Sequence, residues 1–305
     1  MARPEIAVHV LSTASELVLT PPANTWRIDI ISKNDLVLSA SDGIKMEVGS
    51  ETTGYHFLYI DDTFDIGGTD TTMPVSHDSA TTIGFKTSVF GLKQAIPTTM
   101  YTAAMGTAQP DPFIGAGMHE DATAWSTLRI FAPGGATMTG TIYVVYHKKT
   151  KVQIQSHDCG ASPGTEIAFT ELGKKNNHII VSADLTTSGS SIPILQVSPD
   201  GSTYDTGATE YSVAAQNAGL AFRSNASNGV SVGINGTAHQ FFAHLSSTKP
   251  PNAPSSLMNV NTLQGSAPQR ITGRRNASQL DKAVRIVGNG GETFNAGTVY
   301  MLSFP

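Results

Sequence analysis

Short runs of alternating apolar and polar residues recur along the whole chain, whereas a helical spacing of apolar residues is nearly absent. Alternation places apolar side chains on one face of a strand. The runs are separated by Gly, Pro, Asn and Asp, which is typical of short strands joined by turns. The pattern therefore predicts an all-β protein of β-sandwich or jelly-roll type. Strands are expected at residues 7–11, 26–31, 36–40, 56–60, 128–131, 142–146, 179–183, 194–197, 231–234, 240–245, 283–287 and 298–304.

One pattern occurs twice, about half the chain apart. The segment TLRIFAPGGATMTGTIYVVYHK at 127–148 is echoed by AVRIVGNGGETFNAGTVYMLSF at 283–304. In each copy an apolar run meets a Gly-Gly pair and a second β-branched run follows, which predicts a β-hairpin. A hairpin does not bury its apolar face alone, so each half is expected to carry its own sheets. The simplest interpretation is an internal duplication.

The repeat and the length of 305 residues together predict two tandem β-sandwich domains, at residues 1–150 and 151–305. A polar stretch at 148–164 is interpreted as the linker. Long stretches rich in Gly, Ser, Thr, Asn and Pro are interpreted as loops that bind something or are themselves partly strand. They lie at 61–87, 97–121, 215–229 and 249–278.

Four motifs follow one another in the second half of the chain. They are EIAFTELG at 166–173, a strand pattern at 178–185, LQVSPDGSTY at 195–204, and QRITG at 269–273 before the closing repeat. Their order resembles a module of tailed-bacteriophage virion proteins, and the resemblance covers roughly residues 164–304. It implies a β-sandwich in a head decoration, spike or tail-fibre type of structural protein. The first half resembles a diverged copy.

Charge limits the choice of partners. Only 14% of the residues are charged, against about 25% in typical soluble domains. This indicates a surface covered in part by other copies or other proteins, although Ser- and Thr-rich β proteins reach the same composition without partners. The net charge of −5 argues against nucleic-acid binding. The short basic runs, such as Arg274-Arg275, are interpreted as solvated loop residues.

The chain holds one cysteine, Cys159, which excludes an internal disulfide and is interpreted as a small apolar filler. Its beginning lacks the apolar core of a signal peptide, and no stretch approaches the ~20 apolar residues of a membrane span. We therefore expect synthesis in the host cytoplasm, assembly into the virion, and no insertion into a membrane.

Candidate chemistry is sparse. The sequence holds no nucleophile elbow, phosphate-binding loop, zinc motif or paired cysteines, so we expect no enzyme activity and no cofactor. Arg129 and Arg285 lie between apolar neighbours and are expected to face away from the core and to pair with an acid on an adjacent strand. Asp200-Gly201 is interpreted as a tight turn.

Three groups remain as candidate sites. The first is an acidic loop that provides either calcium ligands or solvated carboxylates; its residues are Asp61, Asp62, Asp65 and Asp70. The second is His119-Glu120-Asp121 beside Trp125, which is either a small acid-base or metal cluster or else a polar tip or interface contact. His239 and His244 are expected on opposite faces of a strand and so do not easily share one ion. The third consists of loop aromatics that could stack on sugars or anchor a core; they are Tyr101, Trp125, Tyr211 and Phe222, with Tyr55, Tyr59 and Tyr204 nearby.

Together these observations predict a non-enzymatic structural component of a tailed-phage virion that works as a symmetric homo-oligomer and binds other virion proteins. The alternative is a receptor-binding protein that recognises host surface polysaccharide. A hydrolase would need reactive groups that meet only in the fold.

Overall fold

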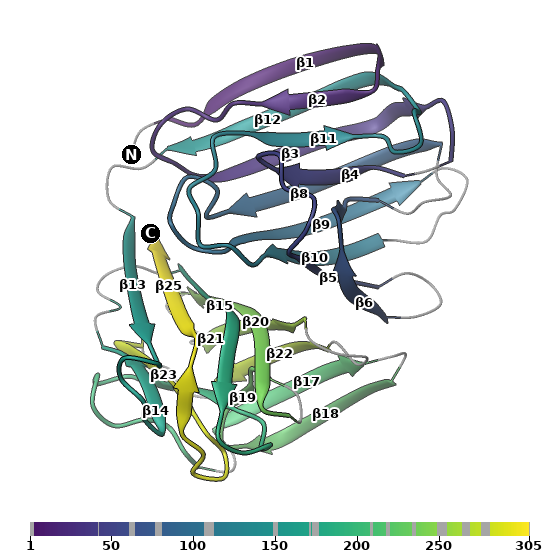
Figure 1. Cartoon of the computed structure of the whole chain (residues 1–305). Coiled ribbons are helices and arrows are strands. Elements are labelled where there is room, and N and C mark those ends of the chain that lie inside the picture. Colours follow the sequence, from purple (N-terminus) through teal and green to yellow (C-terminus); the bar gives the residue numbers. More distant parts are fainter. Residues whose placement is uncertain are drawn as a thin grey trace. The chain divides into compact units, whose positions relative to one another are not determined.

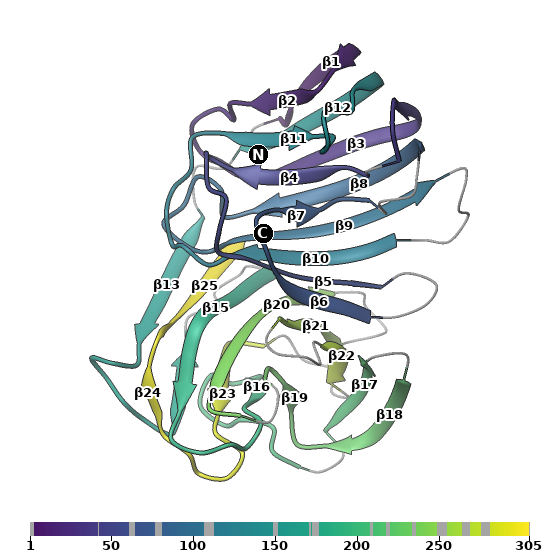
Figure 2. The same ribbon diagram turned by 45° about the vertical axis from the view of Figure 1, so that its right-hand side comes forward.

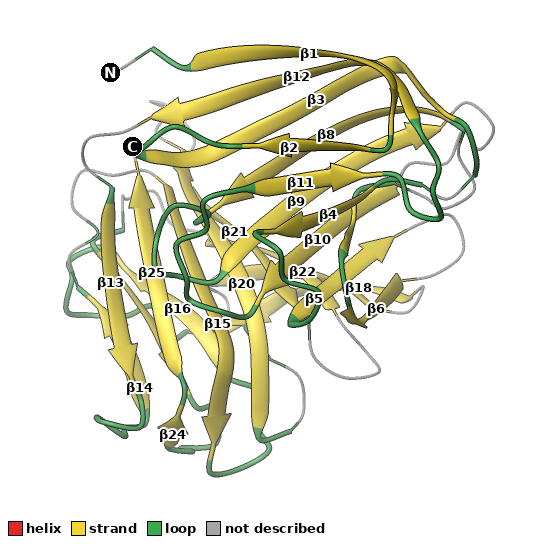
Figure 3. Ribbon diagram, turned by 45° about the horizontal axis from the view of Figure 1, so that its top comes forward, coloured by secondary structure: helices red, strands yellow, loops and turns green. Residues whose placement is uncertain are grey.

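A computed structural model gives the fold of the chain. It describes residues 3–41, 43–60, 65–76, 81–106, 113–148, 152–170, 172, 177–207, 210–217, 220–233, 236–248, 255–263, 269–275 and 281–304. All regular secondary structure in these ranges is β-strand, so the all-β prediction is confirmed (Figure 3). The chain divides into two compact units, Met1–Thr150 and Lys151–Pro305.

Unit 1 consists of an eight-stranded and a four-stranded antiparallel sheet (Figure 1). The larger sheet runs in the order β1 (Glu5–Ala14), β12 (Met138–Lys148), β3 (Thr25–Leu38), β8 (Thr82–Phe90), β9 (Thr98–Gly106), β10 (Phe113–His119), β5 (Tyr55–Ile60) and β6 (Asp65–Asp70). The smaller sheet runs in the order β2 (Glu16–Leu19), β11 (Leu128–Phe131), β4 (Lys45–Val48) and β7 (Met73–Pro74).

Unit 2 repeats this plan. Its larger sheet runs in the order β13 (Gln153–Asp158), β25 (Thr298–Phe304), β15 (Asn177–Thr187), β20 (Ala238–Thr248), β21 (Ser255–Thr262), β22 (Gln269–Arg275), β17 (Tyr211–Asn217) and β18 (Leu220–Ser227), while β24 (Phe294–Ala296) also pairs with β15. Its smaller sheet runs in the order β14 (Glu166–Phe169), β23 (Ala283–Val287), β16 (Ile194–Ser198) and β19 (Val230–Ser231).

The two units match strand for strand. Reading both larger sheets from the edge, β1, β12 and β3 correspond to β13, β25 and β15, and the agreement continues to the last strand. In the smaller sheets, β2, β11, β4 and β7 correspond to β14, β23, β16 and β19. The same connectivity in both sheets of both units is what duplication of one sandwich produces.

The predicted hairpins are wrong. β11 pairs with β2 and β4, whereas β12 pairs with β1 and β3, so the repeated segment crosses from the smaller sheet to the larger one. Figure 2 shows the smaller sheet of unit 1 as a layer of its own. β23 and β25 are separated between sheets in the same way. The Gly-Gly pair turns the chain here, with φ of +66° at Gly134 and +80° at Gly135, but the strands it joins belong to different layers.

Each pair of sheets encloses one hydrophobic core. In unit 1 the buried cluster combines side chains of the larger sheet, such as Ile30 and Val144, with Met46 and Ile130 of the smaller sheet. The cluster of unit 2 does the same, and Cys159 lies in it as a buried free thiol. Burial raises the pKa of the Cys159 thiol to about 11, so the thiol is protonated and unreactive at neutral pH.

One expectation about a connecting segment needs correction. The stretch 148–164 is not a plain linker, because it contains β13, the edge strand of the larger sheet of unit 2. The four long stretches rich in Gly, Ser, Thr, Asn and Pro contain strands, so the alternative that they are partly strand is confirmed. They contribute β6 to β10 in unit 1 and β17, β18, β21 and β22 in unit 2.

The repeated arginines lie where the sequence predicts. Arg129 on β11 donates from Nη1 to Glu47 Oε2 at 2.8 Å, and its Nε pairs with Glu16 on the other neighbouring strand. Arg285 on β23 donates to Glu166 at 2.8 Å and to Gln196 at 2.9 Å. Each arginine therefore ties three strands of a smaller sheet together on its outer face.

A buried tyrosine is repeated as well. The Tyr55 hydroxyl accepts a hydrogen bond from the Val48 amide at 2.8 Å, and the Tyr211 hydroxyl accepts one from the Val197 amide at 2.9 Å. Both rings are fully buried, and burial is the main cause that raises the pKa of both phenols. Each tyrosine thus joins the start of a strand in the larger sheet to the end of a strand in the smaller sheet.

Close approach of the two sheets requires glycine at one repeated position. A Cβ atom on Gly273 of β22 would lie 2.2 Å from Cγ2 of Val230, and one on Gly117 of β10 would lie 3.0 Å from Sδ of Met73. Val230 and Met73 lie on the corresponding strands β19 and β7. Valine is stiff at this contact, whereas methionine has three rotatable bonds and adapts.

We predict that Gly273→Ala lowers the free energy of unfolding by about 1–3 kcal/mol, because the new methyl group overpacks against Val230. Gly117→Ala should cost less than about 1 kcal/mol, because Met73 can change rotamer. Chemical denaturation of the full chain measures both values. Adding Val230→Ala should recover part of the loss in Gly273→Ala, and equal losses in the two glycine variants would contradict this account.

Candidate functional site

The acidic segment does not form a calcium loop in the described residues. Asp61 and Asp62 lie outside these residues, and the side chain of Asp65 does too. The backbones of Asp65 and Asp70 end the six-residue strand β6, which places them about 17 Å apart. The Asp70 carboxylate accepts a hydrogen bond from the Thr71 amide and lies 3.9 Å from Lys45 Nζ. Asp65 and Asp70 therefore cannot share one ion.

The candidate aromatics do not gather into one surface. Tyr211 is buried in the core, so its selection as a ligand-stacking residue is wrong. Trp125 packs against the core of unit 1, and its ring centroid lies 5.1 Å from that of His119. Tyr101 is half-buried on β9 and contacts Phe90 edge-on. Phe222 lies on β18, and its side chain is outside the described residues.

The side chains of His119 and Glu120 have different partners, and the Asp121 amide donates a hydrogen bond to Nδ1 of His119 at 3.3 Å. His119 is buried, and its ring contacts Tyr55 edge-on with centroids 4.7 Å apart. Burial lowers the pKa of His119, which favours a neutral ring. Glu120 extends instead to His56, 3.0 Å away. Among the described residues, no group of three His, Cys, Asp or Glu side chains is placed to hold a metal ion.

The corresponding position in unit 2 holds a buried arginine. His119 pairs in register with Tyr55, and Arg275 pairs in register with Tyr211. Arg275 is fully buried and forms ion pairs with Asp205 and Asp281. The interpretation of Arg274-Arg275 as solvated loop residues is therefore wrong for Arg275, although Arg274 is exposed.

The histidines of β20 have separate surroundings, as their spacing predicts. Buried His239 has its Nε2 atom 2.9 Å from the Thr187 hydroxyl. Half-buried His244 stacks on Phe304 with centroids 6.1 Å apart. The predicted turn at Asp200-Gly201 is also confirmed: Asp200 accepts hydrogen bonds from the Ser202 and Thr203 amides, and Gly201 has a φ of +90°.

A polar cluster on the larger sheet of unit 1 has the residue types of a hydrolase triad. Asp29 accepts hydrogen bonds from Ser88 Oγ at 2.7 Å and from Arg27 Nε and Nη2 at 2.7 and 2.8 Å, and His147 Nε2 lies 2.9 Å from it. In a catalytic triad the histidine lies between the serine and the carboxylate. Here the carboxylate lies in the middle, and the Ser88 proton is directed to Asp29. The arrangement suits a cross-link of β3, β8 and β12.

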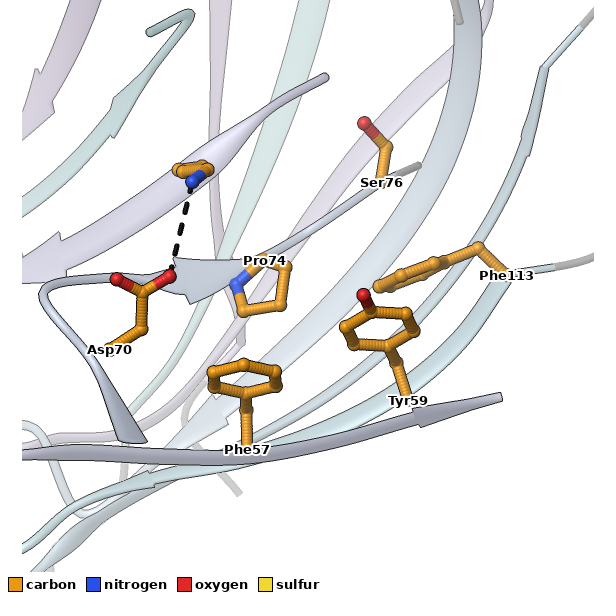
Figure 4. A pocket seen from close by; sticks show the side chains of 7 residues that line it. Phe57, Tyr59, Asp70, Pro74, Ser76 and Phe113 are labelled. Carbon is orange, nitrogen blue, oxygen red and sulfur yellow. Dashed lines mark ion pairs between the residues drawn. The ribbon is translucent and has the colours of Figure 1, made fainter. Parts of the chain in front are cut away.

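A small pocket lies entirely within unit 1, between the far strands of the larger sheet and β7 (Figure 4). Its volume is about 90 Å³. The rings of Phe57 and Tyr59 are parallel within 10°, and Tyr59 also stacks on Phe113 with centroids 5.1 Å apart. Figure 4 shows Pro74 above Phe57, and Asp70 paired with lysine at the rim. Ligand pockets usually measure about 300–1,000 Å³, so this one has room for a substituent rather than a whole sugar ring.

Among the side chains that the structure describes, the most exposed large apolar ones lie on β1. Ile6, Val8 and Val10 are 63%, 56% and 79% exposed, and they alternate with Ala7, His9 and Leu11 on the inner side. Beside them on β12 lie Tyr143 and Val145, both half-buried and in register with Val8 and Ile6. Several large apolar side chains aligned on one surface are typical of interaction sites. Alternation predicts a strand at residues 7–11 but does not show that Val8 and Val10 face outward.

No protein-family model matches the chain, and no curated protein matches its sequence. Among solved structures, the PBSX exported protein XepA aligns with a TM-score of 0.22 and 7% identity over 99% of this chain and 86% of that protein. An acyl-CoA thioesterase II, TesB2 from Mycobacterium marinum, aligns with a TM-score of 0.17 and 10% identity over 78% of this chain and 83% of that protein. Similarities this weak carry no argument about the fold or function of this chain. Among the described residues, no helix has the length and apolarity to cross a membrane.

The Asp29 cluster yields a pH-dependence prediction. Burial opposes ionisation of Asp29, but hydrogen bonds from Arg27, Ser88 and His147 and the charge of Arg27 outweigh it and lower the pKa of the carboxyl below its usual value of 3.8. A depressed pKa in the folded state adds stability above the unfolded-state pKa, and this contribution is lost as the pH falls through the folded-state value.

We predict that Asp29→Asn lowers the free energy of unfolding by about 1–3 kcal/mol at neutral pH. The difference from the wild type should shrink as the pH falls below 3.8, because the carboxyl takes up a proton first in the unfolded state and then, at lower pH, in the folded state. Denaturant titrations between neutral and acid pH measure this difference. Asp35→Asn, at an exposed position on β3, is the control and should change little. If the free energies of unfolding of the wild type and Asp29→Asn differ by the same amount at every pH, the depressed pKa of Asp29 is contradicted.

Proposed function

We propose that this protein is a non-enzymatic structural component of a tailed-phage virion, of decoration, spike or short-fibre type. It acts by assembling with other copies of itself and with other virion proteins. The observation that supports this proposal most is the exposed apolar surface of Ile6, Val8 and Val10 on the edge strand of unit 1. An apolar surface on an edge strand gains free energy when another protein covers it.

The motif order in the second half supports the phage class. EIAF forms β14, the pattern at 178–185 lies in β15, LQVS lies in β16 and ends at the Asp200 turn, and QRITG begins β22. The motifs that carry the resemblance to virion modules thus lie on strands and a turn that build the sandwich. A duplicated sandwich with strands tied by Arg129 and Arg285 suits a part that needs rigidity.

The polar groups that could suggest chemistry have structural partners. Asp29, Arg275 and Glu120 each pair with charged or hydrogen-bonding neighbours, and His119 is packed between aromatic rings. These contacts explain the groups without a reaction.

We predict that the chain is a stoichiometric part of purified phage particles. Mass spectrometry of the particles should detect it in many copies, and a particle map should locate it against neighbouring protein subunits on the head or tail. Absence of the chain from purified particles of a phage that encodes it would contradict the proposal.

Recognition of host surface polysaccharide is the second candidate, and the pocket of unit 1 favours it. Its stacked aromatic rings with a charged pair at the rim can accept an apolar sugar substituent and hydrogen-bond to the adjoining hydroxyls.

If this second function holds, the isolated protein binds capsule fragments, and Tyr59→Ala weakens binding by about tenfold or more because a stacking face is lost. Glycan arrays followed by calorimetry measure the affinity. Tyr143→Ala, on β12 outside the pocket, is the matched control and should bind normally. Equal affinity of the two variants would remove the pocket from consideration.

A further inference from the structure

β1 has an unpaired edge in the described structure. It is the first strand of the larger sheet of unit 1 and pairs only with β12. In an antiparallel sheet, alternate residues of an edge strand point their N–H and C=O groups away from their neighbour. Natural edge strands are usually protected by being short or by lysine, proline or an inward charge. Over its ten residues β1 has one charged residue, Glu5, and no proline, and its one irregularity of register, between Leu11 and Ala14, lies beyond the three exposed apolar residues.

The second unit shows that the fold does not require such an edge. β13 holds the same position in the larger sheet of unit 2, but it has six residues, QIQSHD. Its one apolar side chain, Ile154, is 43% exposed. The same architecture therefore closes with a short polar strand, and the long apolar edge of β1 needs an explanation beyond folding.

The apolar positions of β1 complement themselves under two-fold symmetry. In an antiparallel pair, residues directly opposite each other lie on the same face of the sheet. If Val8 faces Val8 of a second copy, Ile6 of each copy faces Val10 of the other. A shift by one pair in either direction would place Val10 opposite Pro4 or Ile6 opposite Ser12. Centring on Val8 is therefore the register that gives all three exposed apolar residues an apolar partner.

Charge does not oppose this register. Glu5 is the one acid on β1 and forms an ion pair with Lys148 of the same chain. In the symmetric pair Glu5 faces Leu11, so no like charges meet across the axis. The half-buried Tyr143 and Val145 extend the apolar surface on both sides of the pair.

We infer that β1 pairs antiparallel with β1 of a second copy of this chain about a two-fold axis at Val8. This inference rests on the proposed assembly function and names its partner. The pairing joins two eight-stranded sheets into one continuous sheet and satisfies the edge amides of both copies.

The first test is the mass of the full chain in solution. Light scattering over a concentration series should show a dimer, with twice the chain mass of 32.1 kDa. Val8→Lys places two ammonium groups opposite each other at the axis and should reduce the mass to that of one chain. Ile154→Lys, on the corresponding edge of unit 2, is the matched control and should remain a dimer. Unchanged circular dichroism and a single cooperative melting transition show that both variants fold, while loss of the dimer should lower the melting temperature of Val8→Lys alone.

The second test is the register. Val8→Cys should form a disulfide-linked dimer on mild oxidation, because opposed side chains in such a pair have Cβ atoms about 4.5–5.5 Å apart. Ile6→Cys should not, because the two copies of residue 6 are offset by four residues, or about 14 Å. A mixture of Ile6→Cys and Val10→Cys should cross-link. The native Cys159 is buried and is not expected to form a disulfide under these conditions.

Three results would overturn the inference: a monomer over the whole concentration series, a dimer that persists in Val8→Lys, or cross-linking of Val8→Cys to a different protein in particles. The proposed function fails separately. A chain found in particles without cross-linking through Val8 would leave the structural function standing and remove this interface. A chain that is absent from particles but is cross-linked through Val8→Cys in solution would leave this interface standing and remove the structural function.

Discussion

Burial of apolar side chains between a larger and a smaller sheet is the constraint on which the rest of each unit depends. A four-stranded sheet has little core of its own, so its strands pack against the larger sheet, and the chain crosses repeatedly between the two sheets. The repeated segment does this by running from β11 into β12 and from β23 towards β25. Two arginines, Arg129 and Arg285, connect neighbouring strands within the smaller sheets. Two tyrosines of the larger sheets, Tyr55 and Tyr211, accept hydrogen bonds from backbone amides of the smaller sheets and so hold the two layers together.

The positions of strands could be predicted from local alternation, but their partners could not. β11, β23 and β25 coincide with the predicted runs, because apolar periodicity is a property of a few consecutive residues. The Gly-Gly turns suit a hairpin or a crossing between layers equally well, and only packing decides between them. β13 and β6 were missed because a polar edge strand and the Gly-containing DIGGTD segment lack the apolar alternation that marks a half-buried strand.

In the candidate site, too, local sequence predicts some contacts and tertiary packing alone determines others. Pairing of Arg129 and Arg285 with acids was predictable, because flanking apolar residues fix the direction of the side chain. The Asp29 cluster and the pocket combine residues from strands far apart in sequence, so no spacing reveals them. Duplication adds an internal comparison: one position is His119 between aromatic rings in unit 1 and Arg275 between carboxylates in unit 2. A conserved architecture thus carries two different solutions to filling the same space.

The order in which strands pair has a consequence for synthesis. In each unit the edge strand is the first along the chain and its neighbour is the last: β1 pairs with β12, and β13 pairs with β25. A nascent chain therefore cannot complete either sheet until the whole unit has left the ribosome. Until β12 has been synthesised, β1 has no strand to pair with. A polysome that carries several nascent chains brings several such unpaired β1 segments close together. The time that β1 spends unpaired during synthesis therefore exposes this chain to association before folding, in addition to any association of the finished sandwich.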